Sequence, residues 1–224
     1  MQQAAMNHEM TFYGRRVLFI GAHPDDIELG AGALIAQIAQ QTEIMCVTLS
    51  DNQRNPALIN VVDEHYRSMK VLGVADKRVR VEKFITRRFP QERQEILEYL
   101  YALNREFRPD IVFCHTKSDI HQDHYTTMEE TLRAFRGTTV LGFDVLRSSF
   151  GFFPNFLVEV YEPDVECKIC ALAEYKTYCD KYYFDPGTTR ATLVRHGALA
   201  ERPFAEGFEI LRFIGAFRRL NGQG

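Results

Sequence analysis

The first residues that could do chemistry lie directly after an apolar run near the start of the chain. His23, Asp25 and Asp26 follow residues 17–22, which read VLFIGA. Two neighbouring carboxylates repel each other unless a positive group lies between them. A dinucleotide-binding turn carries glycines at this point, which let the backbone approach a pyrophosphate, whereas here the glycines come only in the following helix. The pattern therefore disfavours a nucleotide and favours a bound cation.

A second group of candidate metal ligands follows a later apolar run. The stretch SDIHQDH contains His121, Asp123 and His124. Two imidazoles and one carboxylate with an open coordination position form the ligand set of a hydrolytic zinc site. His23 and Asp26 could both face one ion, and a residue of the second group would complete the set. Two competing interpretations stay open: an Asp-rich turn often caps a helix, and paired histidines often lie on the surface.

The elements that must position these residues alternate along the chain. Short runs rich in β-branched and aromatic residues alternate with longer helical patterns, which indicates a mostly parallel sheet with helices on both faces. We expect strands at 17–22, 43–49, 79–84, 111–115, 139–146 and 156–160, and helices at 28–40, 61–72, 91–107, 125–135 and 165–181. We predict one α/β domain over residues 1–224, a Rossmann-like doubly wound sheet, with residues 1–14 as an N-terminal extension. Ligands of such sheets bind beyond the carboxyl ends of the strands, where both groups fall.

Composition narrows the functional classes. The 224 residues are 46% hydrophobic, which suits an ordinary globular domain, and the net charge of −3 gives no electrostatic reason to bind nucleic acid. The first residues lack the pattern of a secretion signal, and no apolar run reaches the roughly 18 residues that a membrane span needs. Five cysteines without a regular framework predict reduced thiols and a cytoplasmic protein. Cys167 and Cys170 have no second pair to complete a zinc site, so we expect them to pack in the core.

Two motifs together resemble a known enzyme family. AHPDDIELGAGA combined with SDIHQDH is similar to the LmbE-like, or PIG-L, family of zinc-dependent de-N-acetylases, which act on N-acetylglucosamine conjugates. Weaker similarities, in EHYRSMKVLGV, FFPNFLVEV and RHGALAERPFAEGFEILR, extend over most of the chain. The resemblance implies that Zn²⁺ is bound by His23, Asp26 and His124. It also implies that Asp25 is the general base and that His121 stabilises the oxyanion.

The chemistry of a deacetylase agrees with this allocation. A zinc ion can lower the pKa of a bound water to about 7. Asp25, held beside the ion, could accept a proton from that water and pass it to the leaving amine. A protonated His121 would meet the negative charge that forms on the acetamide oxygen. Asp123, between the two histidines, would orient one of the imidazoles.

The remaining candidates concern the substrate. Our candidate substrate contacts are Arg54, Arg147, Asn155 and His196. Three other histidines are expected outside the chemistry, the first in a hydrogen-bonded structural role: His115, His65 and His8. A basic run over residues 78–88 is expected to be a solvated strand face. The closing segment departs from the family pattern at Glu201 and Phe204, which predicts a changed wall on the substrate side.

Three functions remain open. The first is a metallohydrolase that removes the acetyl group from an N-acetylated amino sugar or its conjugate, and the resemblance suggests a homo-oligomer. The second is a non-catalytic, metal-stabilised binding protein, although a structural zinc normally closes its fourth position instead of leaving a carboxylate beside it. The third is a non-haem Fe(II) enzyme, because two histidines and a carboxylate also suit that ion. Asp25 has a role only in the first.

Overall fold

Seven strands form one sheet in the computed structural model, which describes residues 12, 14–52 and 54–215. Their order across the sheet is β3-β2-β1-β4-β5-β7-β6. Neighbours among β1 to β5 are parallel, whereas β7 runs antiparallel between β5 and β6. The strands are β1 (Arg16–Gly21), β2 (Glu43–Thr48), β3 (Val79–Val81), β4 (Ile111–His115), β5 (Thr139–Phe143), β6 (Phe156–Glu159) and β7 (Ala205–Arg212).

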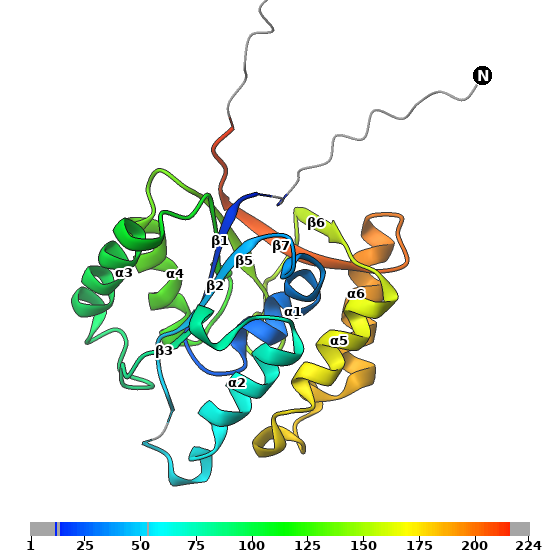
Figure 1. Ribbon diagram of the computed structural model, residues 1–224, viewed down its shortest axis with the longest axis horizontal. Helices are drawn as coiled ribbons and strands as arrows, with labels where there is room; N and C mark the ends of the chain where they lie inside the picture. Colours follow the sequence, from blue (N-terminus) through cyan, green and yellow to red (C-terminus); the bar gives the residue numbers. More distant parts are fainter. Residues whose placement is uncertain (1–11, 13, 53, 216–224) are drawn as a thin grey trace, which may run out of the picture.

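Helices cover both faces of this sheet (Figure 1). α3 and α4 pack on one face, α1, α2 and α5 pack on the other, and α6 lies against α5 and β7. The central strand β1 explains this layering, because Val17 and Phe19 point into one apolar cluster while Leu18 and Ile20 point into the other. The helices are α1 (Asp26–Ile38), α2 (Val61–Val71), α3 (Arg93–Phe107), α4 (Gln122–Ala134), α5 (Glu162–Leu172) and α6 (Pro186–Leu199).

The strand order reverses beside β1, and this reversal places the site. The chain moves from β1 outwards through β2 and β3, and then returns to put β4 on the other flank of β1. The carboxyl ends of β1 and β4 therefore border the crevice where open α/β sheets bind ligands. β1 ends at Gly21, just before His23, and β4 ends at His115, just before the segment with His121 and His124. Topology alone brings the two sequence motifs together.

The predicted fold class is confirmed, with one α/β domain and a mostly parallel sheet. The helix predicted over residues 165–181 is wrong in its second half, because α5 ends at Leu172 and two short 3₁₀ turns follow. The sequence analysis also missed α6 and β7. β7 was hard to recognise because two charged side chains on it, Glu206 and Glu209, are buried beside lysines.

Three smaller expectations concern the N-terminal extension, a membrane span and the packing of two cysteines. Most of the predicted N-terminal extension, residues 1–11 and 13, lies outside the described residues, as does His8. No helix in the described part of the chain is long and apolar enough to cross a membrane. Core packing is right for Cys167, which contacts the apolar cluster, and wrong for Cys170, which is exposed on α5.

A buried ion pair supports a break in α1, the helix that begins with Asp26. Ala31 has φ −142° and ψ 15°, so the helical hydrogen bonds are interrupted there. The Glu206 carboxylate accepts from the backbone N–H groups of Ala33 (3.2 Å) and Leu34 (2.7 Å). Lys168 Nζ donates to the Leu29 carbonyl (2.6 Å) and to Glu206 (2.7 Å). The pair thus satisfies groups on both sides of the break.

We expect Glu206→Gln to lower the free energy of unfolding by about 3–5 kcal/mol, because the buried Lys168 ammonium loses its counter-charge. Urea denaturation of the purified variant measures the effect. The matched control is Asp180→Asn, which removes a carboxylate from the exposed pair with Lys181 and should change stability little. Equal stabilities for the two variants would show that the pair does not hold the break in α1.

Candidate metal centre and active site

A tight turn after β1 brings His23 and Asp26 to the same point. Asp26 Oδ2 accepts hydrogen bonds from the backbone N–H groups of Ala22 (3.0 Å) and His23 (2.7 Å), so the carboxylate folds back over the turn. Pro24 restricts the backbone between them. Both side chains are buried, and α1 starts at Asp26 itself. Local sequence is therefore sufficient to juxtapose these two groups.

His124 of α4 completes a triangle of three candidate ligand residues with that turn. His23 Nδ1 lies 3.1 Å from His124 Nε2 and 3.6 Å from Asp26 Oδ2. His124 Nε2 lies 3.4 Å from Asp26 Oδ1. Ligands about 2.0–2.1 Å from a tetrahedral zinc are about 3.3 Å from one another. The three predicted ligands are of types that bind zinc, and they lie near this spacing, with a different Asp26 oxygen facing each imidazole.

Carboxylates on the far side of each ring set which nitrogen faces the triangle. Asp123 Oδ2 lies 3.1 Å from His23 Nε2, and Asp119 Oδ2 lies 2.8 Å from His124 Nδ1. Ser148 Oγ donates to the same Asp119 oxygen (2.9 Å). Such carboxylate partners commonly fix the orientation of metal-binding imidazoles. Asp123 thus orients His23, which is distant in sequence, instead of one of the two histidines beside it in its own motif.

The sequence analysis missed Asp119, although it lies in the motif SDIHQDH. We expect Asp119→Asn to weaken zinc affinity about 10- to 100-fold, because the His124 ring loses the charged acceptor that aligns it. Competition with a chromophoric chelator measures the affinity. Asp180→Asn, on the exposed surface, serves as the control and should bind zinc like the parent. Unchanged affinity in Asp119→Asn would mean that the ring is aligned by other contacts.

The two facing imidazoles have opposite tendencies to carry a proton. Burial opposes charge on His23, but hydrogen bonds to Asp123 and Asp26 outweigh that cost and raise its pKa to about 10. Burial lowers the pKa of His124 to about 4, despite the opposing charge of Asp26. In the metal-free chain a proton on His23 therefore bridges the two rings. A divalent cation would replace this proton, since metal-bound imidazoles must be deprotonated.

Asp25 lies beside this triangle with an unusual backbone. Its φ of 107° is rarely adopted by residues with a side chain, and strain of this kind persists only where the surroundings enforce it. Burial raises the pKa of the Asp25 carboxyl, and the neighbouring Asp26 charge raises it further. Asp25 also lines the main cavity. A carboxylate with a raised pKa next to a metal centre is suited to accept a proton.

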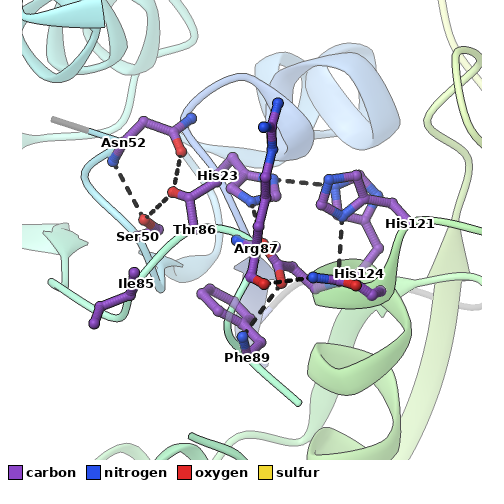
Figure 2. Close-up of polar contacts among 12 residues, drawn as sticks. His23, Ser50, Asn52, Ile85, Thr86, Arg87, Phe89, His121 and His124 are labelled. Atoms are coloured by element: carbon purple, nitrogen blue, oxygen red, sulfur yellow. Dashed lines mark hydrogen bonds and ion pairs between the residues drawn. The ribbon is translucent and has the colours of Figure 1, made fainter. Parts of the chain in front are cut away.

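His121 lies over the same centre but differs from the predicted charge state. Its ring stacks on His124, with centroids 4.4 Å apart, and both rings face His23 (Figure 2). The backbone N–H of Asp123 donates to His121 Nδ1 (3.2 Å), which leaves that nitrogen without a proton. Burial lowers the pKa of His121, and the nearby His23 charge adds to this. These features favour a neutral His121 ring with its proton on Nε2 in place of the expected imidazolium.

His115 has the structural role that the sequence predicted, in direct contact with the centre. Its Nε2 lies 3.0 Å from the backbone nitrogen of Ala22 and 3.2 Å from Asp26 Oδ2. The ring stacks on His124 at 4.0 Å. His65 lies apart from the centre, where it contacts Glu28 and Thr48. Among the described residues, two donor groups have all their ligand atoms within 4.8 Å of one another, namely His23 with His121 and His124, and Asp26 with His115 and His124. Each of them contains two of the three predicted ligands.

The centre opens into a cavity of about 760 Å³. Of the predicted substrate contacts, Arg54 and Arg147 line this cavity. Asn155 does not, because its side chain accepts from the backbone of Ile210 in the β6–β7 pair (2.7 Å). His196 lines a smaller cavity beside Glu206 and Gly207. The prediction that all four line one site is therefore wrong for the last two.

Two further expectations about the cavity need correction. Glu201 is exposed, and Phe204 packs against the apolar cluster of α1, α5 and α6, so neither of them lines the cavity and the predicted change to its wall is wrong. The basic run over residues 78–88 is not only a solvated face, because Arg87 lines the cavity. Two tyrosines from the turns after α5, Tyr178 and Tyr183, also line it and were missed.

Comparison with known proteins decides the family. Residues 18–135, just over half of the chain, match the PIG-L family, described as GlcNAc-PI de-N-acetylase. The chain belongs to the PIG-L family. The matched residues contain every predicted metal ligand together with Asp25 and His121. This PIG-L chain is also 28% identical over 168 residues to the uncharacterized deacetylase YaiS of Escherichia coli K12, covering 72% of this chain and 90% of that protein.

Solved structures show that the PIG-L fold extends over nearly the whole chain. The N,N'-diacetylchitobiose deacetylase of Pyrococcus horikoshii superposes with a TM-score of 0.72 at 19% identity, covering 88% of this chain and 84% of that one. GalB of Pseudomonas putida KT2440, a 4-carboxy-2-hydroxymuconate hydratase, superposes with a TM-score of 0.70 at 20% identity, covering 92% and 99%. One fold thus carries two reactions, so the reaction of this PIG-L member must be argued from its site.

Proposed function

We propose that this chain is a zinc-dependent hydrolase that removes the N-acetyl group from an N-acetylated amino sugar or its conjugate. One observation carries the proposal: His23 Nδ1, His124 Nε2 and the Asp26 carboxylate lie 3.1–3.6 Å apart, and all three residues line an open cavity. The family match supports de-N-acetylation, and the cavity volume suits a sugar conjugate.

Each residue of the centre has a part in this reaction. Zinc bound by the three ligands would supply a water acidified to a pKa of about 7 and a Lewis acid for the amide carbonyl. Asp25 takes the proton of the attacking water and delivers it to the leaving amine. The Nε2–H of His121 donates to the oxygen on which negative charge develops. Asp123 and Asp119 keep His23 and His124 in the orientation that leaves their other nitrogens free.

The competing functions are less consistent with the site. A protein that uses zinc only for stability gains nothing from a strained Asp25 beside an open cavity. An Fe(II) enzyme would use the same three ligands but leaves Asp25 and His121 without a role. Elemental analysis of the protein as purified, followed by activity with zinc or Fe(II) restored to the metal-free protein, separates these functions.

Acetate release tests the proposal directly. The zinc-loaded protein should release acetate from at least one N-acetylglucosamine conjugate in a panel of free sugar, sugar phosphate, disaccharide and glycosides. The parent and Asp25→Asn proteins are compared at equal zinc content. Absence of acetate from every conjugate at full zinc content would contradict the proposed function, and a hydratase assay would then be the next step.

We also propose that the protein acts as a homo-oligomer in the cytoplasm. Phe150 and Phe153 are 80% and 73% exposed, which favours burial against another copy. All five cysteines are free, as expected of a protein in a reducing compartment. Light scattering of the purified protein measures its mass in solution, and a monomer at micromolar concentration would contradict the oligomer.

A further inference from the structure

Outside the metal centre, the charged side chains that line the main cavity are all positive. The carboxylates in its lining are Asp25 and Asp26, both at the centre, whereas three arginines, Arg54, Arg87 and Arg147, line the rest. A divalent cation at the centre would offset the two aspartates. The guanidinium groups then have no opposite charge in the lining, so the cavity is electropositive where the non-reacting part of a ligand would lie.

The backbone of Arg87 is anchored by Asp123, a residue of the metal centre. Its backbone N–H donates to Asp123 Oδ2 (2.5 Å), the same oxygen that contacts His23 Nε2. The Gln122 side chain donates to its carbonyl oxygen. In Figure 2 the Arg87 side chain runs past His23, and the Arg87 backbone N–H and His23 Nε2 both contact Asp123 Oδ2. The same carboxylate therefore anchors the Arg87 backbone and orients His23, which brings the Arg87 side chain to the metal centre.

The backbone of this region is strained where it faces the cavity. Arg87 has a φ of 66° and Asn52, two residues before Arg54, has a φ of 54°. Together with Asp25, three of the residues other than glycine with positive φ in the described chain line the cavity. Strained backbone retained around one cavity favours a role in binding over an accidental placement of charge.

None of the three cavity arginines is paired with a carboxylate of the described residues. Arg54, Arg87 and Arg147 are exposed, and none of them forms an ion pair within the described part of the chain, whereas the less exposed Arg80 and Arg190 do. The Arg147 guanidinium lies 5.8 Å from the centre of the Tyr183 ring, which restricts its position over the cavity. Guanidinium groups without a carboxylate partner are suited to bind planar carboxylates and phosphates through paired hydrogen bonds.

We propose that the substrate carries an anionic group, a carboxylate or a phosphate, on the part of the molecule beyond the acetamido sugar, and that Arg87, with Arg54 and Arg147, binds it. This inference rests on the proposed function for the position of the acetamide. It adds the substrate class: acidic conjugates of an N-acetylated amino sugar, in preference to neutral ones of the same size. Neutral conjugates would leave desolvated guanidinium groups unpaired, which is the origin of the selectivity.

Matched pairs of compounds test the preference. One pair is the 2-carboxyethyl glycoside of N-acetylglucosamine and its primary amide, and the other is N-acetylglucosamine 1-phosphate and the free sugar. We expect the zinc-loaded protein to prefer the anionic member by about tenfold or more in kcat/KM, the scale of a charge-assisted hydrogen bond. Added sodium chloride should reduce this preference, because salt screens exposed charges. The two pairs separate a carboxylate from a phosphate.

Variants test the assignment of the residues. Arg87→Asn removes the charge while asparagine tolerates positive φ, and we expect it to lose most of the preference within each pair. Arg54→Gln and Arg147→Gln should reduce the preference further when combined with it. Arg88→Gln is the matched control, because Arg88 is exposed, adjacent in sequence and outside the cavity lining, so it should keep the parent preference.

Binding of product-type compounds makes the test independent of turnover. Calorimetry of the zinc-loaded parent with the corresponding glucosamine glycosides, which lack the acetyl group, should show tighter binding of the carboxylate than of the amide, and Arg87→Asn should lose this difference. Equal binding and equal turnover of charged and neutral members by the parent would overturn the inference while the proposed function stands. A preference that survives in Arg87→Asn would equally overturn it. Absence of acetate release with an intact, Arg87-dependent binding preference would overturn the proposed function and support the anion site.

Discussion

Replacing His124 with alanine is expected to remove most of the roughly one zinc ion per chain that we predict for the parent protein. His124 Nε2 lies 3.1 Å from His23 Nδ1 and 3.4 Å from Asp26 Oδ1, and it belongs to every compact donor group at the centre. Two ligands would remain, too few for a protein zinc site. Elemental analysis after dialysis against a weak chelator measures the zinc content, and circular dichroism verifies that the variant is folded.

His121→Ala is the matched control for this experiment, because it removes the other histidine of the same motif. We expect it to retain zinc, since Asp26 and not His121 completes the proposed triangle. Loss of zinc from both variants would instead favour the group of three histidines. Loss from His121→Ala alone would exchange the roles of the two residues.

Asp25→Asn is expected to keep its zinc and to lose turnover by on the order of 10²-fold or more, the usual contribution of general acid–base catalysis. The amide has the shape of the carboxylate and tolerates positive φ, so the backbone of the turn should be preserved. The amide oxygen is a poor proton acceptor, which removes the base without removing a metal ligand. Acetate release at measured zinc content gives the result.

The same assay on Asp180→Asn provides a control for general effects of removing a carboxylate, and its turnover should equal that of the parent. Near-normal acetate release by metal-replete Asp25→Asn would mean that another group accepts the proton. Loss of zinc from this variant would place Asp25 among the ligands instead of beside them.

Much of the fold could be predicted because its signals are local. The run Val17–Ile20 is buried on both faces of the sheet, and such strands read as continuous apolar runs. The predicted strand at residues 111–115 coincides with β4. β7 escaped prediction because Glu206 and Glu209 make its sequence polar, and only distant lysines compensate these charges. Helix α6 starts at Pro186 after the Asp185 cap, a signal that was present but not recognised.

The candidate site likewise has features that follow from local sequence and features that do not. The turn that joins His23 to Asp26 spans four residues, so the juxtaposition of an imidazole and a carboxylate follows from sequence. The lowered pKa of His121 could not be read from the motif, because it depends on burial and on the charge of His23, which comes from a distant part of the sequence. The prediction that Asn155 contacts the substrate failed for a related reason. Its amide oxygen accepts a hydrogen bond from the backbone of Ile210 in β7, which is distant in sequence.

The sequence by itself determined the chemical types at the centre and the strand ends that present them, because a strand, a turn and the start of a helix form one short continuous segment. Tertiary structure decided which nitrogen of each ring faces the triangle, which carboxylate orients which histidine, and that Arg87 enters the cavity. Asp123 contacts His23 from 100 residues away and Arg87 from 36, and no local pattern encodes contacts of that separation. They depend on the crossover that places β4 beside β1, and this packing is decided by the apolar residues of the whole domain.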